Sequence, residues 1–338
     1  MLIDEFHPNE FVDALSGILP TGAPVALLDF PWHNNPGDAA LWKGETLALA
    51  KLGHRIVYTS THDTFDRHRL DRLLPTDGVV LLHGGGNLGD LWPRHQKFRE
   101  SIISTVRDRS IVVLPQTVRF EDQRSEIDSL LLMASHPSLT MMARDQRSFD
   151  RLIAAGLNAR LSTDPTTALW PNPSQPHEPQ GRRQVLYLLR SDHERRVPVP
   201  LAPKPLARDW SDLGVTMEIV SRPSHITDRS LDVIDRAQTE FGRALPATCW
   251  ARIARQRRHS DRLVAAATAA ILATDIVVTD RLHGMLFGLA FGRPVIAIES
   301  GYGKLSNYAE TFLGGNRRLH LLHSFDEVAS VLELIERP

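Results

Sequence analysis

Short apolar runs alternate with amphipathic stretches along the first half of the chain. The apolar runs have the length of buried strands, and they include residues 24–30 (PVALLDF), 54–60 (HRIVYTS), 78–86 (GVVLLHGGG), 110–118 (SIVVLPQTV) and 139–145 (LTMMARD). The stretches between them, such as residues 94–109, place apolar side chains at helical spacing. Apolar strands that alternate with helices are typical of parallel sheets. This half therefore predicts a doubly wound α/β domain.

A proline-rich stretch, residues 171–184, interrupts the alternation, because its prolines and polar side chains disfavour regular pairing. The pattern then resumes, with predicted strands at residues 184–190, 215–221, 275–280 and 293–300 and predicted helices at residues 231–243, 263–273, 281–291 and 325–336. We therefore predict two Rossmann-like domains that face a central cleft, residues 1–170 and 185–338, joined by this linker. The last helix either stays with the second domain or packs back on the N-terminal one.

Charge and composition narrow the range of partners. The chain has 39 basic and 40 acidic residues, so its formal net charge of -1 gives no overall field to attract nucleic acid. Cys249 is the single cysteine, which excludes an internal disulfide framework and a thiolate zinc cage. The sequence opens without a signal-peptide pattern, and no apolar run reaches about 18 residues. We expect a cytoplasmic protein with no nucleic-acid partner and no transmembrane segment, and leave open peripheral contact with the plasma membrane.

Candidate binding residues are sought in the loops after strands, because parallel sheets bind ligands beyond the carboxyl ends of their strands. The first such loop, PWHNNPGDAALWKGE, contains Asn35 and Asp38 just before a helix. Asp38 is a good N-cap residue, and its carboxylate is equally suited to bind a substrate hydroxyl. Both roles stay open.

Three consecutive glycines follow the third predicted strand, in LLHGGGNLGDLW. Glycines let the backbone approach an anion closely, so Gly85 and Gly86, with the adjacent Asn87, are candidate donor-binding residues. The triplet is not a dinucleotide-binding fingerprint, which would follow the first strand directly. Farther along, Trp92 offers a face for stacking a sugar, and Asp90 offers an acceptor for its hydroxyls.

Two further loops carry arginines. Arg144 ends a strand in MMARDQRS, where its guanidinium can bind a carboxylate or phosphate, or pair with Asp145. Arg190, Asp192 and His193 follow the first strand of the second domain, in LLRSDHE. This second loop either faces the cleft or is a solvated charged loop.

The segment VVTDRLHGMLFGLAFGRPVIAIESGYGK contains the sharpest pattern. It places Arg281, Leu282 and His283 at the start of a helix, where the N-terminus favours anions. Arg281 adds a positive charge, and His283 adds a donor whose charge can change near neutral pH. Lys304 follows the next strand and can reach the same place. The segment therefore predicts a phosphate or carboxylate site.

Four features in this order resemble the polysaccharide pyruvyl transferase family. They are the GGGN loop, the A-R-D-x-x-S segment, Asp164-Pro165, and TDRLHG followed by a lysine after the next strand. The resemblance extends from about Leu28 to Phe312. It implies a fold similar to the two-domain, GT-B-like glycosyltransferases. It also implies phosphoenolpyruvate as donor and a hydroxyl pair of a saccharide as acceptor, in exopolysaccharide or cell-surface glycan biosynthesis.

The resemblance also implies which residues bind the donor. The arginine and histidine of the R-L-H stretch correspond to Arg281 and His283, and the family's upstream arginine and downstream lysine correspond to Arg144 and Lys304. Arg190 competes with Arg144 for its role. The expected acceptor contacts are Asn35, Asp38, Asp90, Trp92, Asp192 and His193.

Ketal formation needs an acid for C3 of phosphoenolpyruvate and a base for the attacking hydroxyl. We expect His283 to be the acid, and Asp38 or Asp90 to be the base. The arginines and lysine can offset the donor's charge, and the sequence has no D-x-D pair and no H-E-x-x-H motif, so we expect no metal and no cofactor beyond phosphoenolpyruvate as co-substrate. Two alternatives stay open: a nucleotide-sugar-dependent glycosyltransferase of the GT-B type, and a non-catalytic saccharide-binding protein. The acceptor is either free or lipid-linked.

Overall fold

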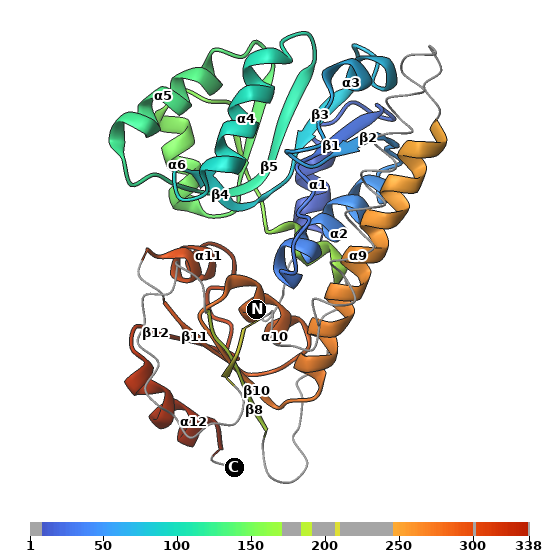
Figure 1. The fold of residues 1–338 in the computed structure, drawn as a ribbon. Helices are drawn as coiled ribbons and strands as arrows, with labels where there is room; N and C mark the ends of the chain where they lie inside the picture. Colours follow the sequence, from blue (N-terminus) through green and yellow to red (C-terminus); the bar gives the residue numbers. More distant parts are fainter. Residues whose placement is uncertain (1–8, 171–183, 191–206, 210–245, 300–301, 337–338) are drawn as a thin grey trace.

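The computed structural model describes residues 9–170, 184–190, 207–209, 246–299 and 302–336 of the chain. The described strands form two separate sheets, and every pairing within them is parallel (Figure 1). This confirms the predicted α/β class with parallel sheets. The linker expected at residues 171–184 lies outside the described residues except for Gln184, as do the elements predicted at residues 215–221 and 231–243.

The first sheet has the strand order β2-β1-β3-β5-β6-β7, with β4 paired to β5. Its strands are β1 (Val25–Leu28), β2 (Ile56–Ser60), β3 (Val79–Leu82), β4 (Gly85–Gly89), β5 (Ser110–Arg119), β6 (Leu139–Ala143) and β7 (Ala159–Leu161). The second sheet has the order β12-β11-β10-β8-β9. Its strands are β8 (Val185–Leu188), β9 (Ala207–Arg208), β10 (Ile276–Thr279), β11 (Val295–Ile298) and β12 (Leu319–Leu322).

Helices cover both faces of the first sheet, because successive residues of a strand point to opposite sides. Ala26 and Leu28 of β1 pack toward α3 (Arg67–Leu73), α4 (Pro93–Thr105), α5 (Gln123–Ala134) and α6 (Gln146–Ala154). Val25 and Leu27 pack toward α1 (Glu10–Ser16) and α2 (Pro36–Lys51). The 3₁₀ helix η1 (Pro165–Leu169) packs closely on α2, where a Cβ on Gly44 would lie 2.0 Å from the Pro165 carbonyl oxygen.

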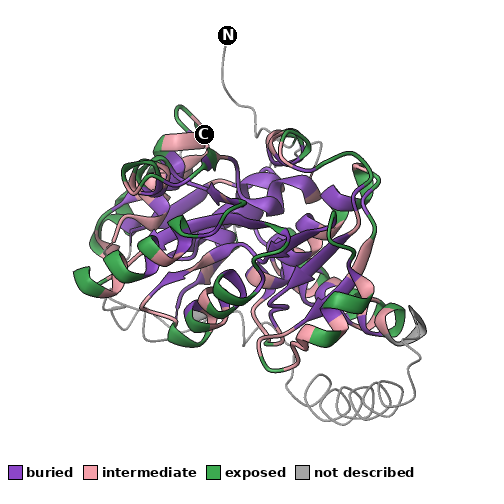
Figure 2. Ribbon diagram, turned by 90° about the horizontal axis from the view of Figure 1, so that it is seen from above, coloured by how far each residue is buried: buried purple, intermediate pink, exposed green. Residues whose placement is uncertain are grey.

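The second sheet is also covered on both faces. Val277 of β10 packs with α9 (Pro246–Leu272), α10 (Leu282–Ala290) and α11 (Lys304–Phe312). Its neighbour Val278 packs on the opposite face with η3 (Phe325–Glu327) and α12 (Val328–Glu336). Figure 2 shows both sheets buried beneath helices whose outer faces are exposed. None of the described helices combines the length and apolarity needed to cross a bilayer.

The helix that crosses between the two sheets is α9, whereas the sequence allowed that role for the last helix. Only the end of α9 was predicted, at residues 263–273, but the helix begins at Pro246 and runs alongside both sheets (Figure 1). Its Gln256 accepts a hydrogen bond from Thr59 Oγ1 at the end of β2 (3.0 Å), and Cys249 Sγ contacts the Val57 carbonyl oxygen (2.9 Å). Of the two placements left open for α12, the structure shows the one with the second sheet, because the apolar side of α12 packs on the face that contains Val278 and Ile296.

Candidate functional site

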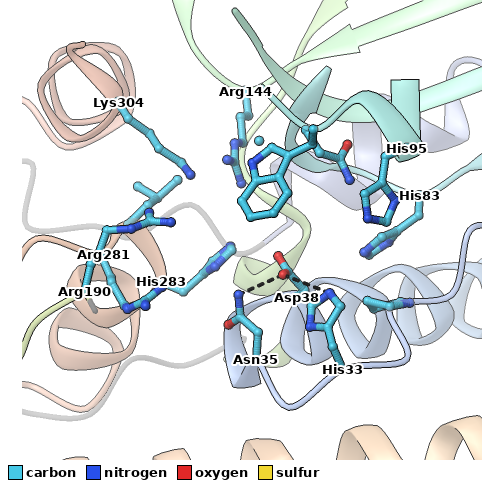
Figure 3. Close-up of a pocket in the computed structure, with 15 residues that line it drawn as sticks. His33, Asn35, Asp38, His83, His95, Arg144, Arg190, Arg281, His283 and Lys304 are labelled. Carbon is cyan, nitrogen blue, oxygen red and sulfur yellow. Dashed lines mark hydrogen bonds and ion pairs between the residues drawn. The ribbon is translucent and has the colours of Figure 1, made fainter. Parts of the chain in front are cut away.

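The carboxyl ends of strands from both sheets meet at a cavity of about 400 Å³ (Figure 3). This volume lies within the range of small-molecule sites, roughly 300–1,000 Å³. The cavity brings together eleven of the fifteen predicted site residues, namely Asn35, Asp38, Gly86, Asn87, Trp92, Arg144, Arg190, Arg281, Leu282, His283 and Lys304. Asp192 and His193 lie outside the described residues, whereas Gly85 and Asp90 are described but do not line the cavity.

The R-L-H stretch is held rigidly at the start of α10. Arg281 occupies the N-cap position, and its backbone N–H donates to Thr279 Oγ1 (3.0 Å), which in turn donates to the Leu188 carbonyl oxygen (2.8 Å). Gly284 permits this packing, since a Cβ there would lie 2.4 Å from Thr279 Oγ1. The helix N-terminus therefore points its positive end at the cavity, as the sequence predicted.

His283 lies where α10 of the second sheet meets α2 of the first. Its Nε2 is 3.5 Å from Asp164 Oδ2, and a Cβ on Gly37 would lie only 2.2 Å from its Nδ1. The imidazole is thus fixed between a glycine and a buried carboxylate. The Asp164 carboxylate lies within reach of the imidazole and limits how the ring can turn.

Arg144 forms a buried ion pair through one nitrogen of its guanidinium, while another nitrogen has no hydrogen-bond partner among the described residues. The side chain is fully buried, and its Nη1 donates to Asp164 Oδ2 (2.6 Å) while its Nε donates to Thr117 Oγ1 (3.0 Å). Its Nη2 has no hydrogen-bond partner among the described residues and belongs to the cavity lining. The alternative pairing with Asp145 is wrong, because Asp145 instead caps α6 by accepting from the Ser148 N–H (2.8 Å).

Asp164 therefore joins two basic side chains of the site, Arg144 and His283. Burial alone would raise the pKa of Asp164, but His283 and Arg144 hold that pKa well below its usual range. The carboxylate stays ionised and orients both side chains. The sequence flagged Asp164 only as part of a family motif and gave it no role.

Lys304 is the first residue of α11, which follows β11 of the second sheet. The N-terminus of α11 is held by Glu299, whose carboxylate accepts from the N–H groups of Leu305 (3.1 Å) and Ser306 (2.9 Å). A Cβ on Gly86 would lie 2.8 Å from Lys304 Nζ and 2.9 Å from Arg144 Nη2. Because Gly86 of β4 has no side chain, Lys304 of the second sheet and Arg144 of the first can both approach its backbone.

Arg190 reaches the cavity from the end of β8. Its backbone N–H donates to Asp280 Oδ1 (2.9 Å), which ties this end to the neighbouring strand β10. Burial raises the pKa of Asp280. Beside it, the Arg281 guanidinium forms an ion pair with Asp209. Three cationic side chains of the second sheet therefore surround the start of α10 (Figure 3).

Asp38 is not the N-cap of α2, because Asn35 takes that position. The Asn35 side chain accepts from the Gly37 N–H (2.9 Å) and donates to Asp38 Oδ2 (2.8 Å). The same oxygen lies 3.5 Å from His33 Nε2. Enclosure in the cavity would raise the pKa of Asp38, but His33 and His283 among its neighbours outweigh this effect and lower the pKa. Asp38 is thus an ionised carboxylate at the cavity wall.

Asp90 is a structural residue, so its expected contact with a sugar is corrected. Its carboxylate accepts from the backbone N–H groups of Glu121 and Asp122, the latter at 2.8 Å, and so anchors the start of α5. Gly85 adopts φ 132° at the beginning of β4, which a side chain would strain. Asn87 lines the cavity while its Oδ1 accepts from Arg99 Nη2 (2.7 Å).

Two histidine–carboxylate pairs at the first-sheet side were not predicted. His83 Nδ1 lies 2.8 Å from Glu45 Oε2, with both side chains buried, and His95 Nδ1 lies 2.8 Å from Asp29 Oδ2. Both histidines line the cavity, together with His33 and Pro31. His83 directly precedes the glycine triplet, and Asp29 directly follows β1, so their places after strands were the signals available in the sequence.

Comparisons with known proteins show which family the chain resembles. The family model described as polysaccharide pyruvyl transferase matches residues 35–302. EpsO of Bacillus subtilis strain 168, presumed by its name to be a pyruvyl transferase, is 26% identical over 90% of this chain and 90% of its own length. Pyruvyl transferase 1 of Schizosaccharomyces pombe is 26% identical over 86% of this chain and 70% of its own.

A solved structure shares the fold. A functionally uncharacterised protein of Klebsiella pneumoniae subsp. pneumoniae NTUH-K2044 matches with a TM-score of 0.61 at 12% identity, over 95% of this chain and all of that one. At this identity the likeness concerns the fold alone.

Proposed function

The chain belongs to the polysaccharide pyruvyl transferase family, and from this premise we propose that it transfers the pyruvyl group of phosphoenolpyruvate to a hydroxyl pair of a saccharide, as a ketal. The observation that carries the proposal is the convergence of Arg144, Arg190, Arg281 and Lys304 with His283 on one cavity. The two sheets would then correspond to the two domains of a GT-B-like arrangement, residues 1–170 and 185–338.

The donor is a compact dianion or trianion. A phosphate monoester carries about -1.5 to -2 charges near neutral pH, and the carboxylate adds one more. Placing such a group in a partly enclosed cavity requires several cations to offset its desolvation. Three of the four cations come from the second sheet, so we propose that the donor lies against the start of α10 with Arg144 on its other side.

His283 is the proposed acid. It protonates C3 of the enol phosphate, so that C2 gains oxocarbenium character and is attacked by one saccharide hydroxyl, which loses its proton to a base. A second hydroxyl of the same saccharide then attacks C2, the C2–O bond to phosphate breaks, and inorganic phosphate leaves with the proton of this second hydroxyl. Asp164, whose Oδ2 lies 3.5 Å from His283 Nε2, orients the imidazole for this proton transfer.

Asp38 is the proposed base for the acceptor. It is ionised, it lines the cavity, and its Oδ2 lies 3.5 Å from His33 Nε2, to which a proton could pass. The indole of Trp92 lines the same cavity and offers a stacking face for the sugar. The acceptor would therefore lie against the first sheet, opposite the cations.

A thermal-shift titration tests the donor assignment. Phosphoenolpyruvate should raise the unfolding temperature of the wild type, and His283→Ala should weaken the effect; pyruvate and uridine diphosphate should give little. A ligand at 100 times its dissociation constant stabilises a protein by about 2.7 kcal/mol. Stabilisation by uridine diphosphate in place of phosphoenolpyruvate would contradict the proposal and favour a nucleotide-sugar glycosyltransferase.

A second measurement separates an enzyme from a binding protein. Release of inorganic phosphate from phosphoenolpyruvate is followed with a panel of β- and α-glycosides as acceptors. Phosphate release that depends on an acceptor, and disappears in His283→Ala, supports transfer. Donor binding with no turnover on any acceptor would favour the non-catalytic alternative.

A further inference from the structure

Asp29, His62 and His95 form a compact cluster at the carboxyl end of the first sheet, beside the cavity. One potential ligand atom from each residue lies within 4.8 Å of the other two. Asp29 follows β1 and His62 follows β2, and these strands are paired so that Leu28 lies opposite Ser60. His95 reaches the same point from the first turn of α4. Three separate elements thus bring two imidazoles and one carboxylate together.

The cluster contains polar atoms whose hydrogen-bonding capacity is not used. Asp29 is 3% exposed, and its Oδ1 has no hydrogen-bond partner among the described residues. His62 Nδ1 likewise has no hydrogen-bond partner among the described residues, whereas Nε2 lies 3.1 Å from Asp63 Oδ2. The Asp29 Oδ1 and His62 Nδ1 atoms are 3.6 Å apart, too far for a hydrogen bond. Buried polar atoms without partners are costly unless a ligand completes them.

The backbone at Asp29 is also unusual. With φ at 69°, it is the one non-glycine residue with positive φ among those described. Such a conformation costs of order 1–3 kcal/mol, and it persists where the surroundings require a particular side-chain direction. Here it turns the Asp29 carboxylate toward His62 and His95.

We infer that Asp29, His62 and His95 bind one divalent transition-metal ion of the zinc type. Two imidazoles and one carboxylate, with a position left for water or substrate, are the ligand set of many open zinc sites. Asp63, beside His62 Nε2, supplies the outer carboxylate that commonly orients a metal-binding histidine. The ion would displace the hydrogen bond between His95 Nδ1 and Asp29 Oδ2 and take both atoms as ligands.

The location suggests what the ion does. His95 lines the cavity on the side of the first sheet, away from the cations that surround the start of α10. An ion there could polarise a hydroxyl group that enters the cavity. This inference does not depend on pyruvyl transfer, because it rests on the cluster alone. It differs from the expectation of a metal-free site, since ligands 66 positions apart in the sequence form no recognisable spacing.

Metal binding is measured directly on the full-length protein, with any affinity tag removed and metal stripped by chelation. We expect isothermal titration to show one Zn²⁺ bound per chain, and Co²⁺ to give the visible absorption of a low-coordinate site. His62→Ala should weaken Zn²⁺ binding by about 100-fold or more. His68→Ala removes an exposed histidine on the nearby α3 and should change nothing.

Asp29→Asn is the second variant, because asparagine tolerates positive φ and keeps the side-chain shape while losing the charge. It should keep the unfolding temperature of the metal-free protein and weaken Zn²⁺ binding by about 100-fold or more. If His62→Ala fails to fold, this variant carries the test. The inference is overturned if the wild type binds no stoichiometric Zn²⁺, if binding survives in both variants, or if His68→Ala abolishes it.

Discussion

The side of the cavity that belongs to the second sheet differs from the side that belongs to the first. The second sheet presents guanidinium and ammonium groups around a helix N-terminus, namely Arg190, Arg281 and Lys304. The first sheet presents three histidines, His33, His83 and His95, each of which has a carboxylate within 3.5 Å. Fixed cations suit the binding of an anion, whereas imidazole–carboxylate pairs suit the handling of protons or a metal ion.

Two residues are exceptions to this division of cations and histidines between the two sheets. Arg144 is a cation from the first sheet, and His283 is a histidine from the second, and both contact Asp164. This carboxylate lies between the end of β7 and η1, where the first sheet meets α10. Asp164 therefore connects the two sides of the cavity. The predictions below distinguish residues that stabilise the fold from residues that bind the donor.

The largest expected effect is on stability, from Arg144→Ala. Removing one partner of a fully buried ion pair leaves an uncompensated charge and typically costs about 3–5 kcal/mol. We expect a loss of this size in the free energy of unfolding, measured by urea denaturation, because Asp164 and Arg144 are both 0% exposed. Asp164→Asn on the Arg144→Ala background should recover part of it. A loss below about 1 kcal/mol would mean that His283 alone holds Asp164.

The next effect is on donor affinity, from Lys304→Met. A hydrogen bond to a charged group contributes about 1.5–3 kcal/mol, so the dissociation constant for phosphoenolpyruvate should rise roughly tenfold to a hundredfold. Stability should change little, in contrast to Arg144→Ala. Glu45→Gln on the opposite side is the matched control, and calorimetric titration should show its donor affinity unchanged. Equal losses in the two variants would remove the distinction between the two sides.

A pH-dependent effect is expected from the His83–Glu45 pair. Burial would lower the pKa of His83, but Glu45 outweighs it, so the pKa is raised above the usual 6.5. The folded protein then holds this proton more tightly than the unfolded chain, and the resulting stability is fully present below about pH 6.5 and lost as pH rises through the folded-state pKa. Unfolding midpoints of the wild type and Glu45→Gln should therefore converge with rising pH. A difference independent of pH would contradict this assignment.

The sequence predicted the parts of this comparison that depend on local pattern. Strands β1, β2, β3, β5 and β6 of the first sheet were found because they are apolar on both faces, and the R-L-H stretch was found because a helix begins there directly after a strand. Strand β4 was missed, because its sequence, GGNLG, is typical of a loop. Eleven predicted residues do share one cavity. For these eleven residues, the residue type and a position after a predicted strand were sufficient to predict that they lie at the site.

The missing parts depend on contacts between distant segments. Asp90 is an acidic residue near a helix start, but only the fold shows that its carboxylate accepts from the backbone N–H groups of Glu121 and Asp122, 31 and 32 positions along the chain. The role of Asp164 requires Arg144 and His283 to arrive from two different sheets. The start of α9 could not be placed, because its contacts with β2 come from residues far apart along the chain.

The smallest expected effect comes from Gly86→Ala, which tests how closely the two sides approach. The added Cβ would meet the ends of two side chains, Lys304 and Arg144, so the fold can absorb it within about 1 kcal/mol while the cations move apart. Donor affinity should fall by no more than about tenfold, less than for Lys304→Met. Gly84→Ala is the control, because its Cβ would lie 2.8 Å from the Pro115 carbonyl oxygen, which cannot swing away. That variant should lose more stability than Gly86→Ala in urea denaturation, and the reverse order would mean that Gly86 serves the backbone of β4 rather than the donor.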